Sequence, residues 1–208
     1  TSSRERALVE QLHASFRTDT METWFHVDAD FFNMDMQVSM PFNRLDSLGE
    51  DYKAYLASFN DPSYIIAADR VSGLPAISAS GQLAYHSLLD VFLKDSGLYF
   101  SNLDFSVTHP PGINRLKANI LGDGISYKMA KTGRLHAALT DSAGIINFDL
   151  STDQTFLNAG HESSFNLSGY FTNRSTLTSF SVYDALGRDL YQLEVAGKVD
   201  SNQIVLEI

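Results

Sequence analysis

The chain has 208 residues, of which 44% are hydrophobic and 19% are charged, so it can build a core and is not intrinsically disordered. Its formal net charge of −10 leaves no basic surface for a nucleic-acid backbone, and its Lys and Arg residues are scattered rather than clustered for a membrane surface. The lack of cysteine excludes disulfides, cysteine-zinc sites and thiol catalysis.

The first predicted element is an amphipathic helix over residues 2–17. Ser2 and Glu5 have the spacing of a capping box, and apolar residues then recur at helical spacing as far as Phe16. No apolar run in the chain approaches the roughly 20 residues that a membrane-spanning helix needs.

Residues 23–31 alternate between apolar and polar side chains, which predicts a half-buried strand. The alternation changes phase at Phe31 and Phe32, and we expect a bulge or a bend there because a slip of one residue exchanges the two faces of a strand. A second alternating stretch comes next and ends at Pro41. Strand spacing places three of its methionines in the core: Met34, Met36 and Met40.

Apolar spacing predicts two further helices, over residues 44–59 and from Ser80 to about Asp95. Strands are expected at 63–68 and 76–79, with a turn at 69–73 between them. In the last 60 residues, apolar residues and turn signals predict strands at 164–171, 177–183, 189–195 and 203–208, with a hairpin turn at 184–187.

A short stretch of the sequence occurs twice. Residues 33–45 and 102–116 share Asn, Asp, Val, Pro, Asn, Arg and Leu in the same order once Pro111 and Gly112 are removed. Weaker matches extend the similarity over 28–80 and 97–150. We interpret this as a duplication, in which the second copy has a short helix near 116–121 where the first has the helix at 44–59.

The predicted fold class is therefore α+β: a mainly antiparallel sheet built from two related strand–helix–hairpin units, with an N-terminal helix. The expected parts are the N-terminal helix at 1–20, the first repeat unit at 21–96, and the second repeat unit with the C-terminal strands at 97–208. Asp35 and Asp104 should occupy equivalent positions in two superimposable halves.

Three groups of polar residues are candidates for chemistry. His26, Asp28 and Asp30 lie at i, i+2 and i+4 of a strand and could converge on a metal, although a solvated polar face explains them better. The repeated pairs Asp35/Asp104 and Arg44/Arg115 fit a structural Asn/Asp/Arg network at the strand–helix junction better than a catalytic or carboxylate-binding site. No nucleophile elbow, P-loop, dinucleotide motif or zinc-protease motif is present. We accordingly predict no catalytic, metal or cofactor-binding residue and no cofactor.

Duplicated β modules without a site favour a non-enzymatic structural subunit of an oligomeric assembly, of the virion, phage-tail or surface-filament type. It would act through contacts with copies of itself or with other subunits, in a virion or in an extracytoplasmic location, and would bind no nucleic acid and insert no segment into a membrane.

A second possibility comes from three Asp-to-Gly hairpins at 69–73, 141–144 and 184–187. They resemble the strand–turn–strand units of PAS- and Cache-type sensor domains. This resemblance implies an extracytoplasmic sensor or ligand-binding domain of a membrane signalling protein. A hydrolase using carboxylates or a metal is a third, less favoured class.

Overall fold

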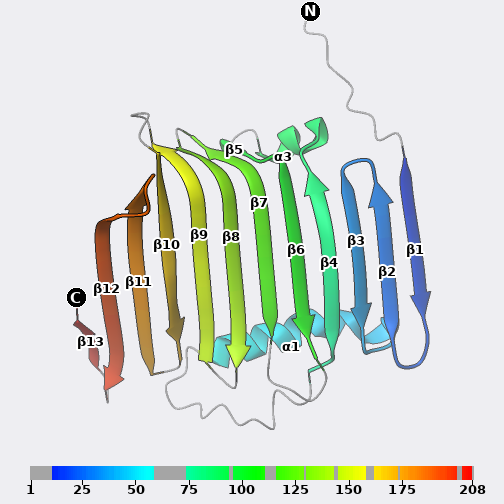
Figure 1. Cartoon of the computed structure of the whole chain (residues 1–208). Coiled ribbons are helices and arrows are strands. Elements are labelled where there is room, and N and C mark those ends of the chain that lie inside the picture. Colours follow the sequence, from blue (N-terminus) through cyan, green and yellow to red (C-terminus); the bar gives the residue numbers. More distant parts are fainter. Residues whose placement is uncertain are drawn as a thin grey trace, which may run out of the picture.

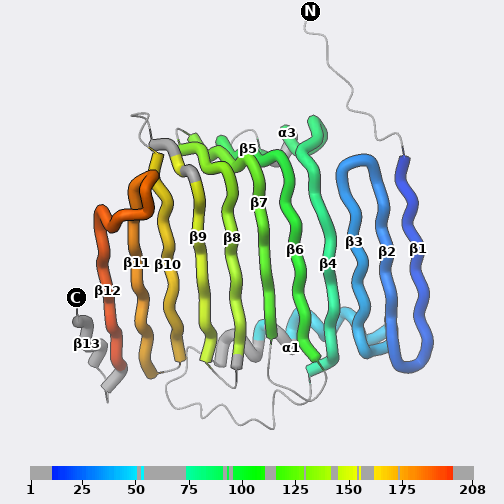
Figure 2. Tube along the Cα trace, viewed as in Figure 1, coloured from blue at the N-terminus to red at the C-terminus, as the bar shows by residue number. Residues whose placement is uncertain are grey.

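The computed structural model describes residues 11–58, 74–93, 96–110, 116–128, 130–142, 145–157, 162–172, 174–200 and 203–207. These ranges form one antiparallel sheet whose strands succeed each other in chain order across its width, so that Figure 1 shows a meander. Figure 2 traces the same path from β1, at the blue edge, to β12 and β13 at the opposite edge. The strand predicted at 63–68 and the turn predicted at 69–73 lie outside the described residues.

Thirteen strands belong to this sheet. In chain order they are β1 (Leu12–Thr18), β2 (Thr23–Ala29), β3 (Phe32–Val38), β4 (Ile77–Ala84), β5 (Leu98–Tyr99), β6 (Asn102–His109), β7 (Lys117–Tyr127), β8 (Ala130–Ser142), β9 (Ile145–Leu157), β10 (Glu162–Phe171), β11 (Ser175–Asp184), β12 (Asp189–Asp200) and β13 (Gln203–Glu207). The short strand β5 lies off the main path and pairs with β7.

Helical structure within the described ranges is confined to two places. The 3₁₀ turn η1 (Phe42–Arg44) leads into α1 (Leu45–Ser58), and η2 (Ser87–Leu89) leads into the single turn α3 (Asp90–Leu93). The helix predicted at 44–59 is thus confirmed. In Figure 1, α1 passes behind the sheet at the end where β1 finishes and β2 begins. No helix in the part of the chain that the structure describes is long and apolar enough to cross a membrane.

The predicted α+β class is wrong, because the sheet is not built from strand–helix–hairpin units. The stretch predicted as helix from Ser80 is β4 as far as Ala84, and the short helix predicted near 116–121 is the first half of β7. The described part of the predicted N-terminal helix is strand β1. The division into 1–20, 21–96 and 97–208 stays a prediction, and all three ranges contribute strands to the one sheet.

The two copies of the repeated stretch both form a strand, but the chain continues differently after each strand. Asp35 lies on β3 and Asp104 on β6, and these strands flank β4 on its two sides. Beyond its proline, β3 continues into η1 and α1, whereas the described chain after β6 resumes as β7. The expected superimposable halves with a helix in each are therefore not formed.

The phase change at Phe31 and Phe32 is a tight hairpin rather than a bulge. Ala29 on β2 pairs with Phe32 on β3, which leaves Asp30 and Phe31 as the two turn residues. A hairpin reverses the chain and restores the same face, so that the alternation resumes in the opposite phase.

Candidate contact surface and polar groove

One face of the sheet is apolar across eleven strands. Residues paired across antiparallel strands point to the same side of the sheet, so the register defines rows of neighbouring side chains. The middle row runs from β1 to β12 through Ala14, Val27, Met34, Gly81, Phe105, Ile120, Ala137, Leu150, Leu167, Phe180 and Leu193. This row contains no polar side chain.

The rows on either side are also apolar, with few exceptions. One contains Phe16, Phe25, Met36, Ala79, Val107, Ala118, Leu139, Phe148, Gly169, Thr178 and Val195. The other contains Leu12, Ala29, Phe32, Leu83, Leu103, Gly122, Leu135, Thr152, Phe165, Val182 and Tyr191. We call these three rows the apolar face.

The alternate residues of the same strands form a polar face on the other side. Its central row contains Ser15, His26, Asp35, Ser80, Ser106, Asn119, Ala138, Asp149, Ser168, Ser179 and Glu194. A sheet with one solvated face shows this alternation, and the polar face therefore accounts for one side of the sequence pattern. The apolar face needs another explanation.

Most large side chains on the apolar face are half-buried, and a few are exposed. Phe16 is 48% exposed, Ile120 44% and Tyr191 52%. Within the described ranges, the fully buried side chains are Val38, Thr23 and Asp141, all at the end of the sheet nearest η1. A domain normally buries a sheet face beneath a second layer of structure. Among the described ranges α1 lies at this end, and η2 with α3 lies at the opposite end, where Phe100 is 3% exposed.

Phe42 of η1 forms part of that partial cover. Its ring lies 4.9 Å from the ring of Phe16 and 6.5 Å from that of Phe25, both on the apolar face. Ile146 is 3% exposed at the same end and packs against Leu139. The rest of the face extends away from this cluster without a covering element among the described residues.

Two glycines leave room for phenylalanine rings on the apolar face. A Cβ placed on Gly81 would stand 2.7 Å from Cζ of Phe105, which is its neighbour on β6. A Cβ on Gly169 would stand 2.9 Å from Cζ of Phe148 on β9 and would also collide with the carbonyl oxygen of Leu177. Each ring fills the space above its glycine, so the face is continuous rather than pitted.

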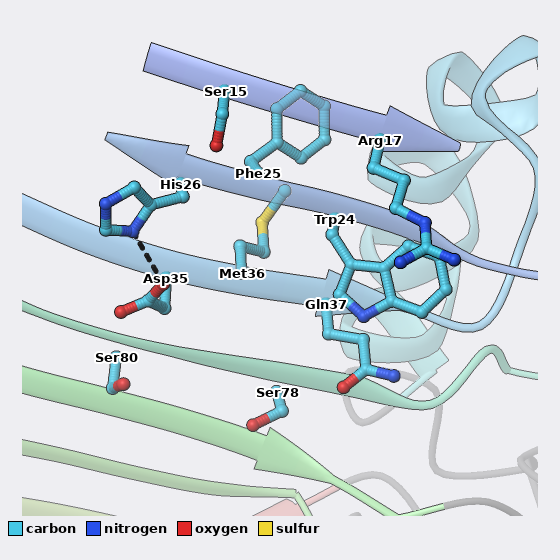
Figure 3. Close-up of a pocket in the computed structure, with 10 residues that line it drawn as sticks. All are labelled: Ser15, Arg17, Trp24, Phe25, His26, Asp35, Met36, Gln37, Ser78 and Ser80. Atoms are coloured by element: carbon cyan, nitrogen blue, oxygen red, sulfur yellow. Dashed lines mark hydrogen bonds and ion pairs between the residues drawn. The ribbon is translucent and has the colours of Figure 1, made fainter. Parts of the chain in front are cut away.

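The polar face carries a shallow groove of about 240 Å³ over β1 to β4. Figure 3 shows the ten residues that line it: Ser15, Arg17, Trp24, Phe25, His26, Asp35, Met36, Gln37, Ser78 and Ser80. Eight of the ten belong to two adjacent rows of the polar face, Ser15–His26–Asp35–Ser80 and Arg17–Trp24–Gln37–Ser78. We call this site the Trp24 groove.

Polar groups in the Trp24 groove are held in place by contacts with one another. Nδ1 of His26 lies 2.8 Å from Oδ1 of Asp35, and the two side chains are 44% and 76% exposed. The guanidinium of Arg17 stands 5.2 Å from the centre of the Trp24 ring in a cation–π arrangement. Gln37 donates a hydrogen bond from Nε2 to Glu22 at 3.1 Å.

The turn between β1 and β2 fixes the end of the groove that holds Arg17 and Trp24. Oδ1 of Asp19 accepts hydrogen bonds from the backbone N–H of Met21 at 2.7 Å and of Glu22 at 2.8 Å. These two bonds favour the carboxylate and hold the pKa of Asp19 below its usual value. The turn therefore keeps its shape at neutral pH and sets the pairing of Arg17 with Trp24.

The predicted metal candidates do not converge. His26 and Asp28 lie on the polar face of β2, whereas Asp30 is in the hairpin turn, where its carboxylate accepts the backbone N–H of Gln11 at 3.2 Å. His26 is instead paired with Asp35 on the neighbouring strand. No three possible metal ligands come together in the described ranges.

The predicted Asn/Asp/Arg network is replaced by other contacts. Asp35 contacts His26, and Asp104 accepts a hydrogen bond from Nε2 of Gln82 at 2.8 Å. Arg44 is exposed in η1, and Arg115 lies outside the described residues. The repeated aspartates thus bind to polar neighbours on the sheet surface, and the repeat marks similar strands rather than a shared site.

Sequence reasoning missed the Trp24 groove because its residues come from four strands. The available signal was the alternation itself, since Trp24 and His26 fall on the same face of β2 as Arg17 and Ser15 of β1. Comparison of the chain with protein-family models, with curated proteins and with solved structures gives no match.

Proposed function

We propose that this chain is a non-enzymatic structural subunit that works through its apolar face, which a protein partner covers in the assembled state. The observation that carries the proposal is the unbroken apolar middle row, eleven residues wide, which runs across the sheet beyond the end that η1 and α1 cover among the described residues. A soluble protein does not keep such a surface in contact with water, because the exposed apolar area favours association.

The size of the face supports a protein partner. Eleven strands at about 4.8 Å spacing span about 50 Å, and three rows at about 7 Å cover about 20 Å, which gives an area of about 1,000 Å². Contiguous apolar patches on monomers seldom exceed about 600 Å². A stable protein–protein interface buries about 800 Å² on each side. The apolar face is therefore of the size of an interface.

The chemistry of the face also fits a sheet or helix layer from another subunit. Two sheets pack about 10 Å apart through interdigitating apolar side chains. The three rows hold no charged residue, so a partner would not have to desolvate a charge to cover them. The net charge of −10 lies elsewhere on the chain and keeps the assembled particle soluble.

Sedimentation of the purified chain tests this proposal. We expect a dimer or larger species at micromolar concentration, or a monomer that is recruited by its natural partner, together with slow hydrogen exchange across β6 to β9 in the assembled form. A chain that stays monomeric at all concentrations, and whose apolar face binds a hydrophobic dye strongly in the presence of its assembly partners, would contradict it.

A further inference from the structure

We propose that the Trp24 groove is a binding site for a neutral carbohydrate. The groove lies on the polar face, so this site is separate from the contact surface on the apolar face. Trp24 is the one tryptophan of the chain, and its indole is half-buried with Arg17 stacked against it. The face of the indole that Arg17 does not cover offers a flat apolar surface for the C–H groups of a sugar ring, and the guanidinium adds N–H donors beside it.

Free hydrogen-bonding groups surround this platform. Asp35 uses Oδ1 for His26, and its Oδ2 has no hydrogen bond within the described residues. Gln37 uses its Nε2 for Glu22 and presents its amide oxygen. Ser78 and Ser80 place two hydroxyl groups along the opposite side. The groove therefore offers both acceptors and donors, as the hydroxyl groups of a sugar require, because each hydroxyl both donates and accepts.

The charges in the groove disfavour other ligand classes. Arg17 is the one Lys or Arg side chain that lines it, and the Asp35 carboxylate is part of the same wall, so a phosphate or carboxylate ligand would meet repulsion as well as attraction. A metal lacks a third ligand among the described residues. An apolar ligand would leave the groups around the indole without partners. A neutral, hydroxyl-rich molecule can pack its C–H groups against the indole and hydrogen-bond to the polar groups around it.

The fluorescence of Trp24 provides the test, because no other tryptophan contributes to the signal. The wild-type chain is titrated with glucose, galactose, mannose, N-acetylglucosamine and oligosaccharides of each, up to about 10 mM. We expect a saturable change for at least one of these probes, and a lower dissociation constant for the oligosaccharide if the natural ligand is a longer glycan. Glucuronate and inorganic phosphate are titrated in parallel as anionic probes.

Asp35→Ala and Gln37→Ala should each weaken sugar binding about tenfold or more, the loss expected for a hydrogen bond to a polar or charged group. Trp24→Ala should remove the transfer of magnetisation from protein to sugar in a saturation-transfer NMR experiment. The matched control is Asp149→Ala, because Asp149 also stands next to a histidine on the polar face, 3.7 Å from Nδ1 of His136, but far along the sheet on β9. The control should bind as the wild type does.

Three results would overturn the proposal. The first is no saturable signal with any sugar; the second is stronger binding of an anionic probe than of every neutral sugar. The third is equal loss of binding in Asp149→Ala and Asp35→Ala, which would mean that the signal reports the whole polar face. Circular dichroism and thermal unfolding of each variant establish that a loss of binding is not a loss of fold.

Discussion

Ile120 and Leu121 offer a matched test of the contact surface, because they are neighbours on β7 with opposite orientations. Ile120 is 44% exposed and pairs with Phe105 and Ala137 on the apolar face. Leu121 is 45% exposed and pairs with Asp104 and His136 on the polar face. We expect Ile120→Lys to disrupt assembly and Leu121→Lys to leave it unchanged.

The magnitude comes from the area that a partner would cover. Full burial of an isoleucine side chain contributes about 1.5–3 kcal/mol, so covering the 44% that is exposed contributes roughly 0.7–1.3 kcal/mol. In a symmetric pair this contact occurs twice, and its loss alone raises the dissociation constant about 10- to 70-fold. Desolvating the introduced ammonium groups adds several kcal/mol and raises it further.

Analytical ultracentrifugation over a wide range of concentrations measures this change, and thermal unfolding checks that both variants fold. If Ile120→Lys and Leu121→Lys raise the dissociation constant equally, then the added charge or the lost β propensity, rather than the apolar face, controls assembly. A wild-type chain that shows no association, alone or with its partner, would refute the reasoning before the variants are made.

Two further predictions concern the sheet itself. Gly169→Ala should lower the free energy of unfolding by about 1–3 kcal/mol, because the added Cβ would collide with the carbonyl of Leu177 and the ring of Phe148. Denaturant unfolding measures this change. The control Ser168→Ala, on the opposite face, should change the free energy of unfolding little. The pKa of Asp184 is lowered from 3.8, first by the backbone N–H of Arg188 and then by the Arg188 side chain, with Nε at 2.7 Å. Because this pKa is lowered, the contribution of Asp184 to stability is present above pH 3.8 and is lost as the pH falls through the folded-state pKa. A titration followed by NMR should place the midpoint of the Asp184 carboxylate below pH 3.8. Asp184→Asn should remove this part of the acid dependence of stability.

The sequence predicted strands where alternation is clear, because alternation is a local signal, but it assigned no strand ranges to β8 and β9 and predicted a helix at the start of β7. The β2 and β3 region and the strands from β10 to β13 were placed correctly, and the 184–187 turn is confirmed, with Gly187 at a φ of 74°. The helix at 44–59 was also found. These elements depend on the spacing of side chains within one segment, which the sequence shows directly.

The errors arose where two periods fit the same residues. Leu12 and Phe16 are four apart, which suits a helix face, but Leu12, Ala14 and Phe16 also alternate as in a strand, and pairing with β2 decides between the two. Ala79, Gly81 and Leu83 alternate through the region predicted as helix from Ser80, and Gly81 is needed there for the ring of Phe105. Such choices depend on neighbouring strands that are distant in sequence, so tertiary pairing overrides local preference.

The two proposed surfaces are compatible because one strand pattern creates both. Alternation places Phe25 on the apolar face and Trp24 with His26 on the polar face of the same strand. A partner that covers the apolar face leaves the Trp24 groove facing solvent, so assembly would display grooves outward rather than bury them. Assembly would also hold β1 to β4 more rigidly, and a preformed groove binds its ligand with a smaller loss of conformational entropy. Sugar affinity should therefore be equal or higher in the assembled form than in an Ile120→Lys monomer, and a groove that binds only in the monomer would show that the two surfaces compete.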